Sequence, residues 1–218
     1  MPLRLHFLRH GQTPASRENR FCGRGLDLPL TPDGEAMAEA FAGFHRAPHR
    51  GTAWRAVYAS PLRRTRATAA PAATAAGLTV RPLDGLAELD YGRWDGCTPE
   101  AVDRDFHDDY VRWTADPAWN APTDGETAAA LAQRVLGAIE AITSAEGDDG
   151  DVLVVSHKAS IRVALCGLLG VDVGRFRFRF ACPTGSVSVV EFGPHGPMAL
   201  SVADRSHLDE RLRGLPGT

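Results

Sequence analysis

The chain has 218 residues, of which 44% are hydrophobic and 23% are charged, which is typical of one globular domain with a sizeable core. Its net charge of -3 at pH 7 argues against bulk attraction to nucleic acid or to an anionic membrane. No apolar run approaches the ~20 residues of a membrane span, and the amino terminus lacks the hydrophobic region of a signal peptide.

The predicted elements alternate between strands and helices. Strands are expected, in chain order, over Leu3–Leu8, Ala56–Ala59, Thr79–Pro82, Val152–Val155, Ser186–Phe192 and Ala199–Ala203. The run Val152–Val155 has no polar alternation, which is typical of a strand covered on both faces. Strands that alternate with helices predict a three-layer α/β/α sandwich with a mainly parallel central sheet.

Three helices have recognisable starts in the sequence. Thr31-Pro32 marks one start, and Ser60-Pro61 repeats this signal before a helix of roughly fifteen residues that ends at Gly77. A third helix is expected to be capped by Asp124 or Thr123, because Thr123-x-x-Glu126 matches a capping box.

Residues 1–218 are expected to form one domain, because the chain shows no linker and no internal repeat. The segment 97–122 is predicted to be an insertion that covers the active site. Its aromatic residues Tyr110, Trp113 and Trp119 either stack on an organic leaving group or form only a hydrophobic cap. The end of the chain, Arg213–Thr218, is expected to be a frayed tail.

Four segments carry residues suited to phosphate chemistry, and three of them lie at strand ends, where open α/β sheets bind ligands. They are Arg9-His10-Gly11, Ser60–Ala69, Leu86–Gly96 and Val155–Lys158. Gly11 is expected to let the backbone approach a ligand closely. Backbone N–H groups and arginines at the helix start in the second segment suit a phosphate. Each feature alone is ordinary, and it is their joint order that indicates a site.

The chain resembles the histidine phosphatase superfamily, in its phosphoglycerate mutase-like branch, nearly from end to end. The resemblance is carried by Leu8-Arg9-His10-Gly11-Gln12-Thr13, Gly23…Asp27-x-Pro29-Leu30-Thr31-x-x-Gly34, Ser60-Pro61-Leu62-x-Arg64, Leu86-x-Glu88-x-x-x-Gly92-x-Trp94-Asp95-Gly96, Gly125-Glu126-Thr127, Ser156-His157 and Asp204-x-Ser206-His207-Leu208. It implies a phosphoglycerate mutase-like fold.

The same resemblance implies that His10 attacks phosphorus and becomes a phosphohistidine. Arg9, Arg64 and His157 would surround the equatorial oxygens, while Glu88 would protonate the leaving oxygen and then deprotonate the attacking water. Neither a metal nor another cofactor is expected. The residue types agree with this assignment, because two nearby guanidinium groups disfavour an imidazolium and keep His10 nucleophilic.

Phosphate binding is also expected of Ser16, Cys22 and Gly23. Ser16 stands where the family commonly has an asparagine, and its hydroxyl can also donate a hydrogen bond. Lys158 stands where the family usually has a glycine, and a cation at a helix start opposes the helix dipole at a cost of ~0.3–1 kcal/mol. Two readings of Lys158 are open: it reaches the substrate or its second anionic group, or it points to solvent.

Hydrolysis of a small phosphorylated metabolite, with inorganic phosphate as product, is the function favoured by the sequence. The pattern Leu86-x-Glu88…Trp94-Asp95-Gly96 resembles the phosphatase-type members. Phosphoglycerate mutase-type transfer is the first alternative, although the sequence shows no evident tail to shield a phosphohistidine from water. The second alternative is a noncatalytic phosphate-binding module. No nucleic acid or membrane partner is expected, and a homodimer is left open.

Other enzyme classes lack their motifs in this sequence. There is no GxxxxGK[ST] loop for a nucleotide, and no cysteine has an arginine six residues later, as a cysteine-based phosphatase would need. The four cysteines, which are Cys22, Cys97, Cys166 and Cys182, show neither a CxxC pair nor metal-ligand spacing. They favour reduced thiols, and therefore a cytoplasmic location.

Overall fold

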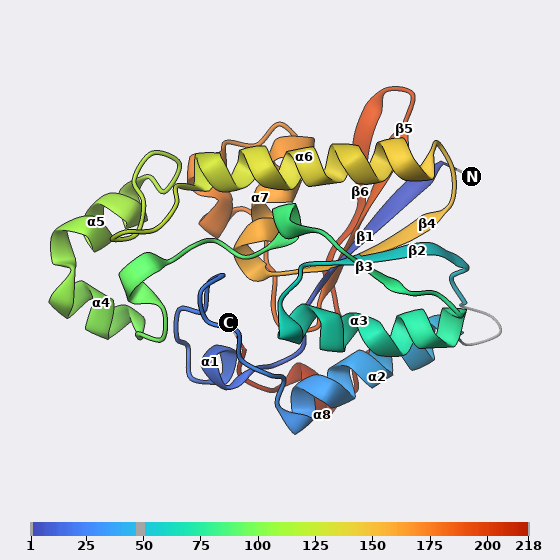
Figure 1. Cartoon of the computed structure of the whole chain (residues 1–218), viewed down its shortest axis with the longest axis horizontal. Coiled ribbons are helices and arrows are strands. Elements are labelled where there is room, and N and C mark those ends of the chain that lie inside the picture. Colours follow the sequence, from blue (N-terminus) through green and yellow to red (C-terminus); the bar gives the residue numbers. More distant parts are fainter. Residues whose placement is uncertain (1, 47–50, 218) are drawn as a thin grey trace.

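The computed structural model describes residues 2–46 and 51–217, which build a six-stranded sheet between two layers of helices (Figure 1). The strands are β1 (Leu3–Arg9), β2 (Trp54–Ala59), β3 (Val80–Pro82), β4 (Asp151–Ser156), β5 (Val187–Gly193) and β6 (Gly196–Asp204). Their order is β3-β2-β4-β1-β5-β6. The first four of these are parallel, whereas β5 is antiparallel to both β1 and β6. The predicted α/β/α sandwich is confirmed.

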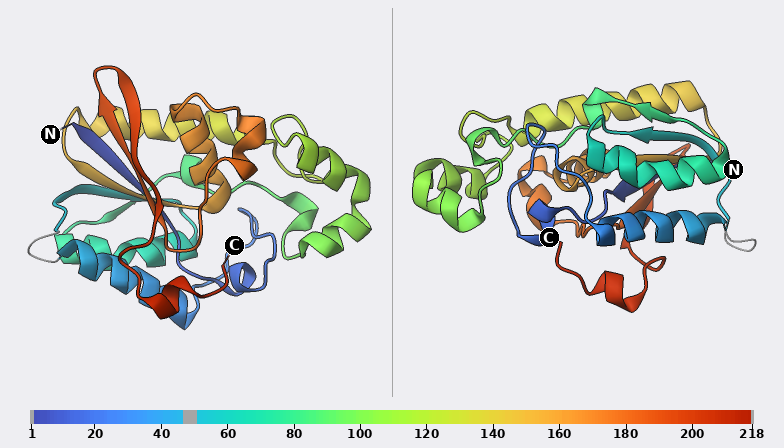
Figure 2. Two further views of the ribbon diagram at one scale, coloured as in Figure 1. Left: turned by 180° about the vertical axis from the view of Figure 1, so that it is seen from behind. Right: turned by 60° about the horizontal axis from the view of Figure 1, so that its bottom comes forward.

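Helices cover both faces of this sheet. The α-helices are α1 (Pro14–Arg17), α2 (Pro32–Arg46), α3 (Arg63–Ala76), α4 (Pro99–Asp105), α5 (His107–Ala115), α6 (Ala128–Glu146), α7 (Lys158–Leu168) and α8 (Glu210–Arg213). In Figure 2, α6 and α7 lie on one face and α2 and α3 on the other, while α4 and α5 project from one end. Short 3-10 helices span Asp84–Leu86, Gly92–Trp94 and Val173–Phe178.

Alternation along the strands divides the core between the two helical layers. Leu5 and Phe7 of β1 belong to the cluster that contains the apolar stripes of α6 and α7. Leu8, which points to the opposite face, belongs to the cluster with residues of α2 and α3. Strand β4 is buried on both sides, with Val152–Val155 each 0% exposed, as its uninterrupted apolar run predicts.

The carboxyl ends of β1, β2 and β4 meet at one edge of the sheet. Arg9 is the register partner of Ser156, and the His10 N–H donates to the Ser156 carbonyl at 3.1 Å. The Ser60 N–H, just after β2, donates to the carbonyl of Val155 at 3.0 Å. Residues that follow three strands are therefore brought together, as the motif positions predict.

Gly11 is needed for a different reason from the one expected. A Cβ on Gly11 would lie 2.3 Å from the carbonyl oxygen of Gly34, and a Cβ on Gly34 would lie 2.1 Å from the carbonyl oxygen of Gln12. The loop after β1 thus packs directly against the first turn of α2. The close approach is between two backbones rather than between Gly11 and a ligand, which corrects the prediction.

Two helices begin later than predicted. Helix α3 begins at Arg63 instead of Ser60-Pro61, because the carboxylate of Asp27 accepts the Arg63 N–H at 2.8 Å. Helix α6 begins at Ala128, with Thr127 as its N-cap. The capping box predicted at Thr123 and Glu126 is therefore wrong. The Thr123 hydroxyl instead accepts from the Trp94 indole at 3.1 Å, and Glu126 pairs with Arg134.

The end of the chain is docked on the protein rather than frayed. The Gln12 side-chain amide donates to the Pro216 carbonyl at 2.6 Å, and the Thr184 N–H donates to the Gly217 carbonyl at 3.3 Å. Thr218, the last residue of the predicted tail, lies outside the described residues. The described part of the tail returns to the loop after β1 (Figure 1).

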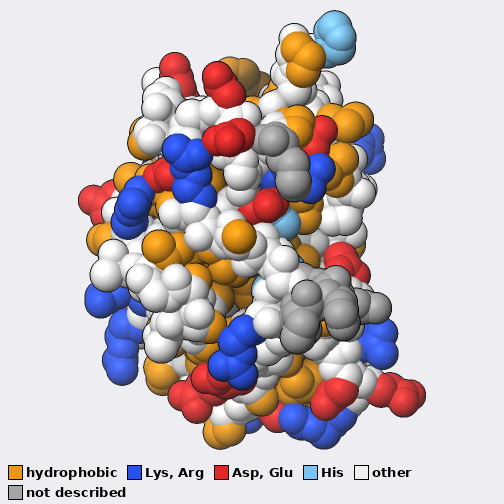
Figure 3. Space-filling view, turned by 90° about the vertical axis from the view of Figure 1, so that its right-hand side faces the viewer, with side chains coloured by type: hydrophobic (Ala, Val, Ile, Leu, Met, Phe, Trp, Pro, Cys, Tyr) orange, Lys and Arg blue, Asp and Glu red, His pale blue; other side chains and the backbone are white. Residues whose placement is uncertain are grey.

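The surface away from α4 and α5 carries both signs of charge. Figure 3 shows lysine or arginine and aspartate or glutamate side chains interspersed over this end of the molecule. Across residues 2–46 and 51–217, no helix has the length and hydropathy needed to span a bilayer. The same residues hold no group of three or more histidine, cysteine, aspartate or glutamate side chains placed to bind a metal ion.

The glycine contact between the β1 loop and α2 predicts a stability difference between two substitutions in one helix. Gly34→Ala should lower the free energy of unfolding by about 1–3 kcal/mol, because its methyl group would overlap a backbone oxygen. Gly43→Ala is the matched control, since a Cβ there meets nothing within 4 Å, and it should be neutral or stabilising by ~0.5–1 kcal/mol. Urea unfolding of both variants measures the difference. Equal stability of the two variants would contradict the packing argument.

Candidate active site

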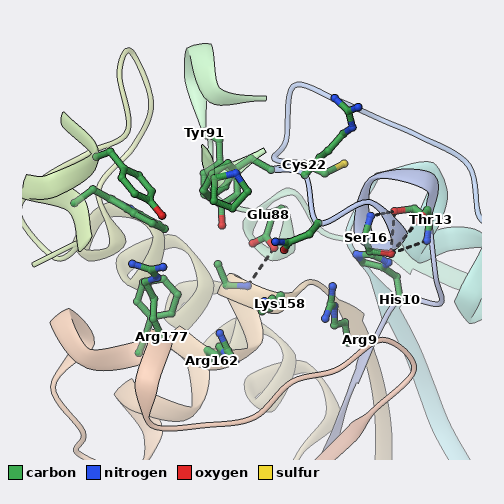
Figure 4. A pocket seen from close by; sticks show the side chains of 18 residues that line it. Arg9, His10, Thr13, Ser16, Cys22, Glu88, Tyr91, Lys158, Arg162 and Arg177 are labelled. Atoms are coloured by element: carbon green, nitrogen blue, oxygen red, sulfur yellow. Dashed lines mark hydrogen bonds between the residues drawn. The ribbon is translucent and has the colours of Figure 1, made fainter. Parts of the chain in front are cut away.

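A cavity of about 160 Å³ opens at the carboxyl ends of β1 and β4 (Figure 4). Its walls come from the loop after β1, the Glu88 segment, α5, α7 and the 3-10 helix Val173–Phe178. The lining residues are Arg9, His10, Thr13, Ser16, Asn19, Arg20, Phe21, Cys22, Glu88, Tyr91, Pro99, Tyr110, Trp113, Lys158, Ala159, Arg162, Phe176 and Arg177. Of the sequence-predicted site residues, Gly23, Arg64 and His157 are not among them.

His10 is held in one tautomer by the backbone. Its Nδ1 lies 2.7 Å from the carbonyl oxygen of Gly11, and since a carbonyl can only accept, Nδ1 carries the proton and Nε2 carries the lone pair. Burial is the main reason that the pKa of His10 lies well below its usual range, and the charges of Arg64 and Arg9 lower it further. Both arginines lower the pKa of His10 as predicted, although burial is the largest cause.

Arg64 and His157 form a buried pair behind His10. The Arg64 Nε–H donates to Nδ1 of His157 at 3.2 Å, which leaves the proton of a neutral His157 on Nε2, 2.8 Å from the Ser60 hydroxyl. Burial, and then the charge of Arg64, hold the pKa of His157 well below its usual range. The ring centroids of His157 and His10 are 5.3 Å apart, so the Arg64–His157 pair lies next to the candidate nucleophile.

The remaining Arg64 donors are occupied by the loop after β1. Nη1 donates to the carbonyl of Leu26 at 2.8 Å, and Nη2 donates to the carbonyls of Gly23 at 2.9 Å and Cys22 at 3.3 Å. Arg64 is 0% exposed. In this structure it therefore supports the loop and does not line the cavity.

The Glu88 carboxylate lies against the start of α7, and hydrogen bonds hold both of its oxygens. Oε1 accepts from the N–H groups of Leu89 at 2.8 Å and Ser160 at 3.2 Å, and from the Ser160 hydroxyl at 3.2 Å. Oε2 accepts from the N–H of Ala159 at 3.1 Å. The carboxylate also places negative charge at the positive end of the helix dipole, which compensates for Lys158 at that same end.

Arg134 and Ser160 position the Glu88 segment and were missed in the sequence. Arg134 on α6 donates to the carbonyls of Gly85, Ala87 and Glu88 at 3.0, 2.7 and 2.8 Å. The Ser160 hydroxyl donates to the carbonyl of Ala87 at 2.8 Å. No sequence signal identifies these two residues, because their partners are backbone carbonyls.

Ser16, Cys22 and Gly23 use their donors within the protein. The Ser16 hydroxyl accepts from the Thr13 N–H at 2.9 Å in the capping box of α1 and donates to the Thr13 carbonyl at 3.0 Å. The Cys22 thiol donates to the Leu26 carbonyl at 3.3 Å, and burial raises its pKa. The Gly23 N–H donates to the Asp95 carboxylate at 2.5 Å. Ser16 and Cys22 line the cavity, but none of the three directs a free donor into it.

Arg9 connects the cavity to the end of the chain. Its Nη1 donates to the carbonyls of Cys182 at 2.6 Å and Gly217 at 3.2 Å, and burial lowers its pKa. The docked tail therefore helps to fix the arginine of the Arg9-His10-Gly11 motif.

Lys158 lines the cavity, and its contact with the substrate stays a prediction. Burial, and then the charges of Arg9 and Arg162, lower its pKa to about 7. The sequence did not identify Arg162 and Arg177 as site residues. Arg162 lies at i+4 from Lys158 on α7, a spacing that could have identified it, whereas Arg177 carries no such signal.

The segment 97–122 contributes Pro99, Tyr110 and Trp113 to the cavity wall. Trp113 is 2% exposed and packs with Trp94 and Phe21 at ring-centroid distances of 5.3 and 5.8 Å. Trp119 is 77% exposed and is not among the lining residues. Of the three aromatic residues singled out in this segment, Tyr110 and Trp113 therefore line the cavity and Trp119 does not.

The imidazole contacts predict the tautomers and the pH response of the site. At pH 6, His10 should be neutral with its proton on Nδ1, and His157 neutral with its proton on Nε2, as read by long-range 1H–15N spectra. Because both folded-state pKa values are lowered, the unfolded chain binds protons first. Folding stability should therefore fall as the pH drops below about 6.5. An imidazolium at either position at pH 6 would contradict the assignment.

The chain belongs to the histidine phosphatase superfamily (branch 1), whose sequence profile matches residues 5–205. Phosphoserine phosphatase 1 of Hydrogenobacter thermophilus is 31% identical over 208 residues, covering 95% of each chain. The adenosylcobalamin/alpha-ribazole phosphatase of Escherichia coli is 28% identical over 169 residues, covering 78% of this chain and 80% of that one. These relatives support a phosphatase.

A solved structure agrees with this family. The mycobacterial glucosyl-3-phosphoglycerate phosphatase, in its complex with VO3, superposes with a TM-score of 0.81 at 26% identity, and the match covers 93% of this chain and 99% of that one. The phosphoglycerate mutase-like fold that the sequence motifs implied is therefore confirmed.

Proposed function

We propose that this protein hydrolyses a small phosphate monoester through a phosphohistidine on His10, with guanidinium groups in place of a metal. The observation that carries the proposal is the hydrogen bond from Nδ1 of His10 to the Gly11 carbonyl. It leaves Nε2 as the nucleophilic atom of a buried, neutral imidazole in a cationic cavity. A neutral imidazole can attack phosphorus, whereas an imidazolium cannot.

Each step of this reaction has a group at the cavity to perform it. Nε2 of His10 forms a bond to phosphorus as the bond to the ester oxygen breaks. The Glu88 carboxylate takes up a proton when the phosphate ester dianion binds beside it, and it gives this proton to the departing alkoxide. Glu88 then takes a proton from water, whose oxygen attacks phosphorus and releases phosphate and free His10. Arg9 stabilises the charge on the phosphoryl oxygens in both steps.

Arg64 joins this clamp by exchanging partners. In the present structure its Nη2 donates to the neutral carbonyls of Cys22 and Gly23. A phosphate dianion is a stronger acceptor than a carbonyl, so we propose that phosphate replaces these carbonyls and that the Cys22–Gly23 loop shifts. Ser16 would be released from Thr13 in the same way. His157 stays paired to Arg64 and keeps it oriented.

Similarity to phosphatases supports a small phosphorylated metabolite as substrate. The named relatives include phosphatases for phosphoserine, alpha-ribazole and glucosyl-3-phosphoglycerate. A cavity of about 160 Å³ suits a compact leaving group. We propose that residues 1–218 act as one domain and that the 97–122 segment caps the cavity through Tyr110 and Trp113.

Two substitutions test the roles of nucleophile and acid. His10→Ala should lower kcat for p-nitrophenyl phosphate by about 1,000-fold or more, because it removes the imidazole that attacks phosphorus. Glu88→Gln should lower kcat for an alkyl phosphate by about 100-fold to 10,000-fold. With p-nitrophenyl phosphate, whose leaving group needs no proton, Glu88→Gln should show a burst of p-nitrophenol before slow turnover.

The control for these measurements is Arg66→Gln, which removes an exposed charge from the same helix as Arg64 and should leave kcat unchanged. Phosphatase activity that survives in His10→Ala would exclude His10 as the nucleophile. A wild-type protein that binds phosphate esters without releasing phosphate would instead be a noncatalytic binding module.

The docked tail gives phosphoglycerate mutase-type transfer a specific observation in its favour. Pro216 and Gly217 lie against Gln12 and Arg9, where a tail could exclude water. We predict that 3-phosphoglycerate with a trace of 2,3-bisphosphoglycerate gives inorganic phosphate, measured by a molybdate assay. Formation of 2-phosphoglycerate with negligible phosphate release would establish the mutase instead.

A further inference from the structure

We propose that Lys158, Arg162 and Arg177 form a second anion site, which binds a carboxylate or a second phosphate on the leaving group of the substrate. This inference rests on the proposed function, since it concerns the part of the ester that departs from phosphorus. We refer to these three residues as the distal cation row. The distal cation row would favour phosphate esters whose leaving group carries a second anionic group over phosphate esters of uncharged alcohols.

The charge of the cavity exceeds what one phosphate requires. Arg9, Lys158, Arg162 and Arg177 line it together with a single carboxylate, that of Glu88, although the whole chain has a net charge of -3. Arg20 also lines the cavity, but it is paired with the Glu18 carboxylate at 2.8 Å. In the proposed mechanism, Arg9 next to His10 stabilises the charge of the phosphoryl group. The distal cation row is additional, and its positive charge in a confined cavity attracts a further anion.

The row also holds donors that the protein leaves unused. Arg162 Nε and Arg177 Nη1 are buried atoms without a hydrogen-bond partner among residues 2–46 and 51–217, and so is the Trp113 indole nitrogen. Leaving a buried donor unsatisfied costs about 1–3 kcal/mol, so native proteins seldom leave one unpaired without a reason. A bound oxyanion would supply the acceptor that the two arginine donors lack.

Other arginines near the cavity use their donors within the protein. The guanidinium groups of Arg64 and Arg134 donate to backbone carbonyls and hold loops in place. Arg162 and Arg177, in contrast, form no hydrogen bond or ion pair within the described part of the chain. The arginines near the cavity therefore divide into those that support its wall and those available to a ligand.

Stacking prepares Arg177 to bind a planar or tetrahedral oxyanion. Its guanidinium carbon lies 4.0 Å from the centroid of the Trp113 ring. A guanidinium stacked on an aromatic face keeps the N–H groups along its edge free for bidentate binding. The contact fixes the guanidinium before the ligand arrives, which lowers the entropic cost of binding.

Lys158 and Arg162 lie between the Arg9 end and the Arg177 end of the cavity. Both face it from consecutive turns of α7, about 5–6 Å apart between their Cβ atoms. Figure 4 shows Arg9, Lys158, Arg162 and Arg177 along one side, with His10 near Arg9 and Arg177 at the far end. The second anion would therefore lie roughly one helical turn or more beyond the phosphate, which suits a leaving group of a few carbon atoms.

Matched substrates test the inference directly. The pair 3-phosphoglycerate and glycerol 3-phosphate differs by a carboxylate in place of a hydroxymethyl group. The pair 1,3-propanediol bisphosphate and 1,3-propanediol monophosphate tests a second phosphate. The wild-type protein should favour the doubly anionic member of at least one pair by about tenfold or more in kcat/KM, and the favoured pair identifies the anion.

Arg162→Gln and Arg177→Gln should each reduce that preference by about tenfold, whereas Arg175→Gln should preserve it. Arg175 is the matched control because it lies on the same 3-10 helix as Arg177, is exposed and does not line the cavity. A wild-type protein that hydrolyses all four esters without preference would overturn the distal cation row and leave the proposed hydrolase intact. A preference that Arg162→Gln and Arg177→Gln both retain would also overturn it.

A binding measurement separates this inference from the proposed chemistry. In the His10→Ala background, calorimetry should show tighter binding of the doubly anionic member in a pair, and Arg162→Gln should abolish the difference. This result would support the distal cation row even if no ester were hydrolysed, an outcome that would overturn only the hydrolase. Equal affinities for both members of both pairs would overturn the row itself.

Lys158 offers a direct spectroscopic probe, because it is the single lysine of the chain. Reductive 13C-methylation of the His10→Ala protein should give one lysine NMR signal, which Lys158→Arg removes. Its pKa, about 7 in the free protein because of burial and the charges of Arg9 and Arg162, should rise when the favoured ester binds. An unchanged pKa in the saturated complex would exclude Lys158 from the row.

Discussion

The site depends on keeping an imidazole neutral among buried cations. His10 is buried, the charges of Arg64 and Arg9 act on it, and its Nδ1–H donates to the Gly11 carbonyl. Burial and positive charge act in the same direction, because each disfavours a second proton on the ring. The arrangement selects one nitrogen, Nε2, as the lone-pair donor. The other interactions around the site maintain this condition.

Backbone groups hold most of the site side chains in place. Carbonyls of the loop after β1 hold Arg64, Arg64 orients His157, and carbonyls of Cys182 and Gly217 hold Arg9. The Glu88 carboxylate accepts two N–H groups from the first turn of α7. The loop itself is positioned by the contact of Gly11 with Gly34. The geometry of the site is therefore built into the packing of the sheet edge and two helix starts.

Local patterns in the sequence predict the strands and the meeting of their carboxyl ends. The valine run of β4 and the motifs after β1, β2 and β4 are read directly from periodicity and chain position. Features that depend on distant partners escape this reasoning. Asp27 determines where α3 begins, Arg134 holds the Glu88 segment from α6, and the tail reaches Arg9 from the far end of the chain.

The cations of the cavity show the same limit. Lys158 attracts notice in the sequence because it stands at a helix start, and Arg162 follows it by one turn. Arg177 comes from a separate 3-10 helix, and only the folded chain places it on Trp113 at the same cavity. The surface as a whole is mixed in charge (Figure 3), so the concentration of positive charge in the cavity is a property of the fold and not of the composition.

In the proposed mechanism, Nε2 of His10 is the atom that receives the phosphoryl group. Glu88→Gln, mixed with an activated phosphate ester and quenched in base, should accumulate one phosphorylated residue. A 31P–1H correlation spectrum of the active-site peptide should then show phosphorus on Nε2 of His10. Phosphorus on Nδ1, or on any other residue, would contradict the account.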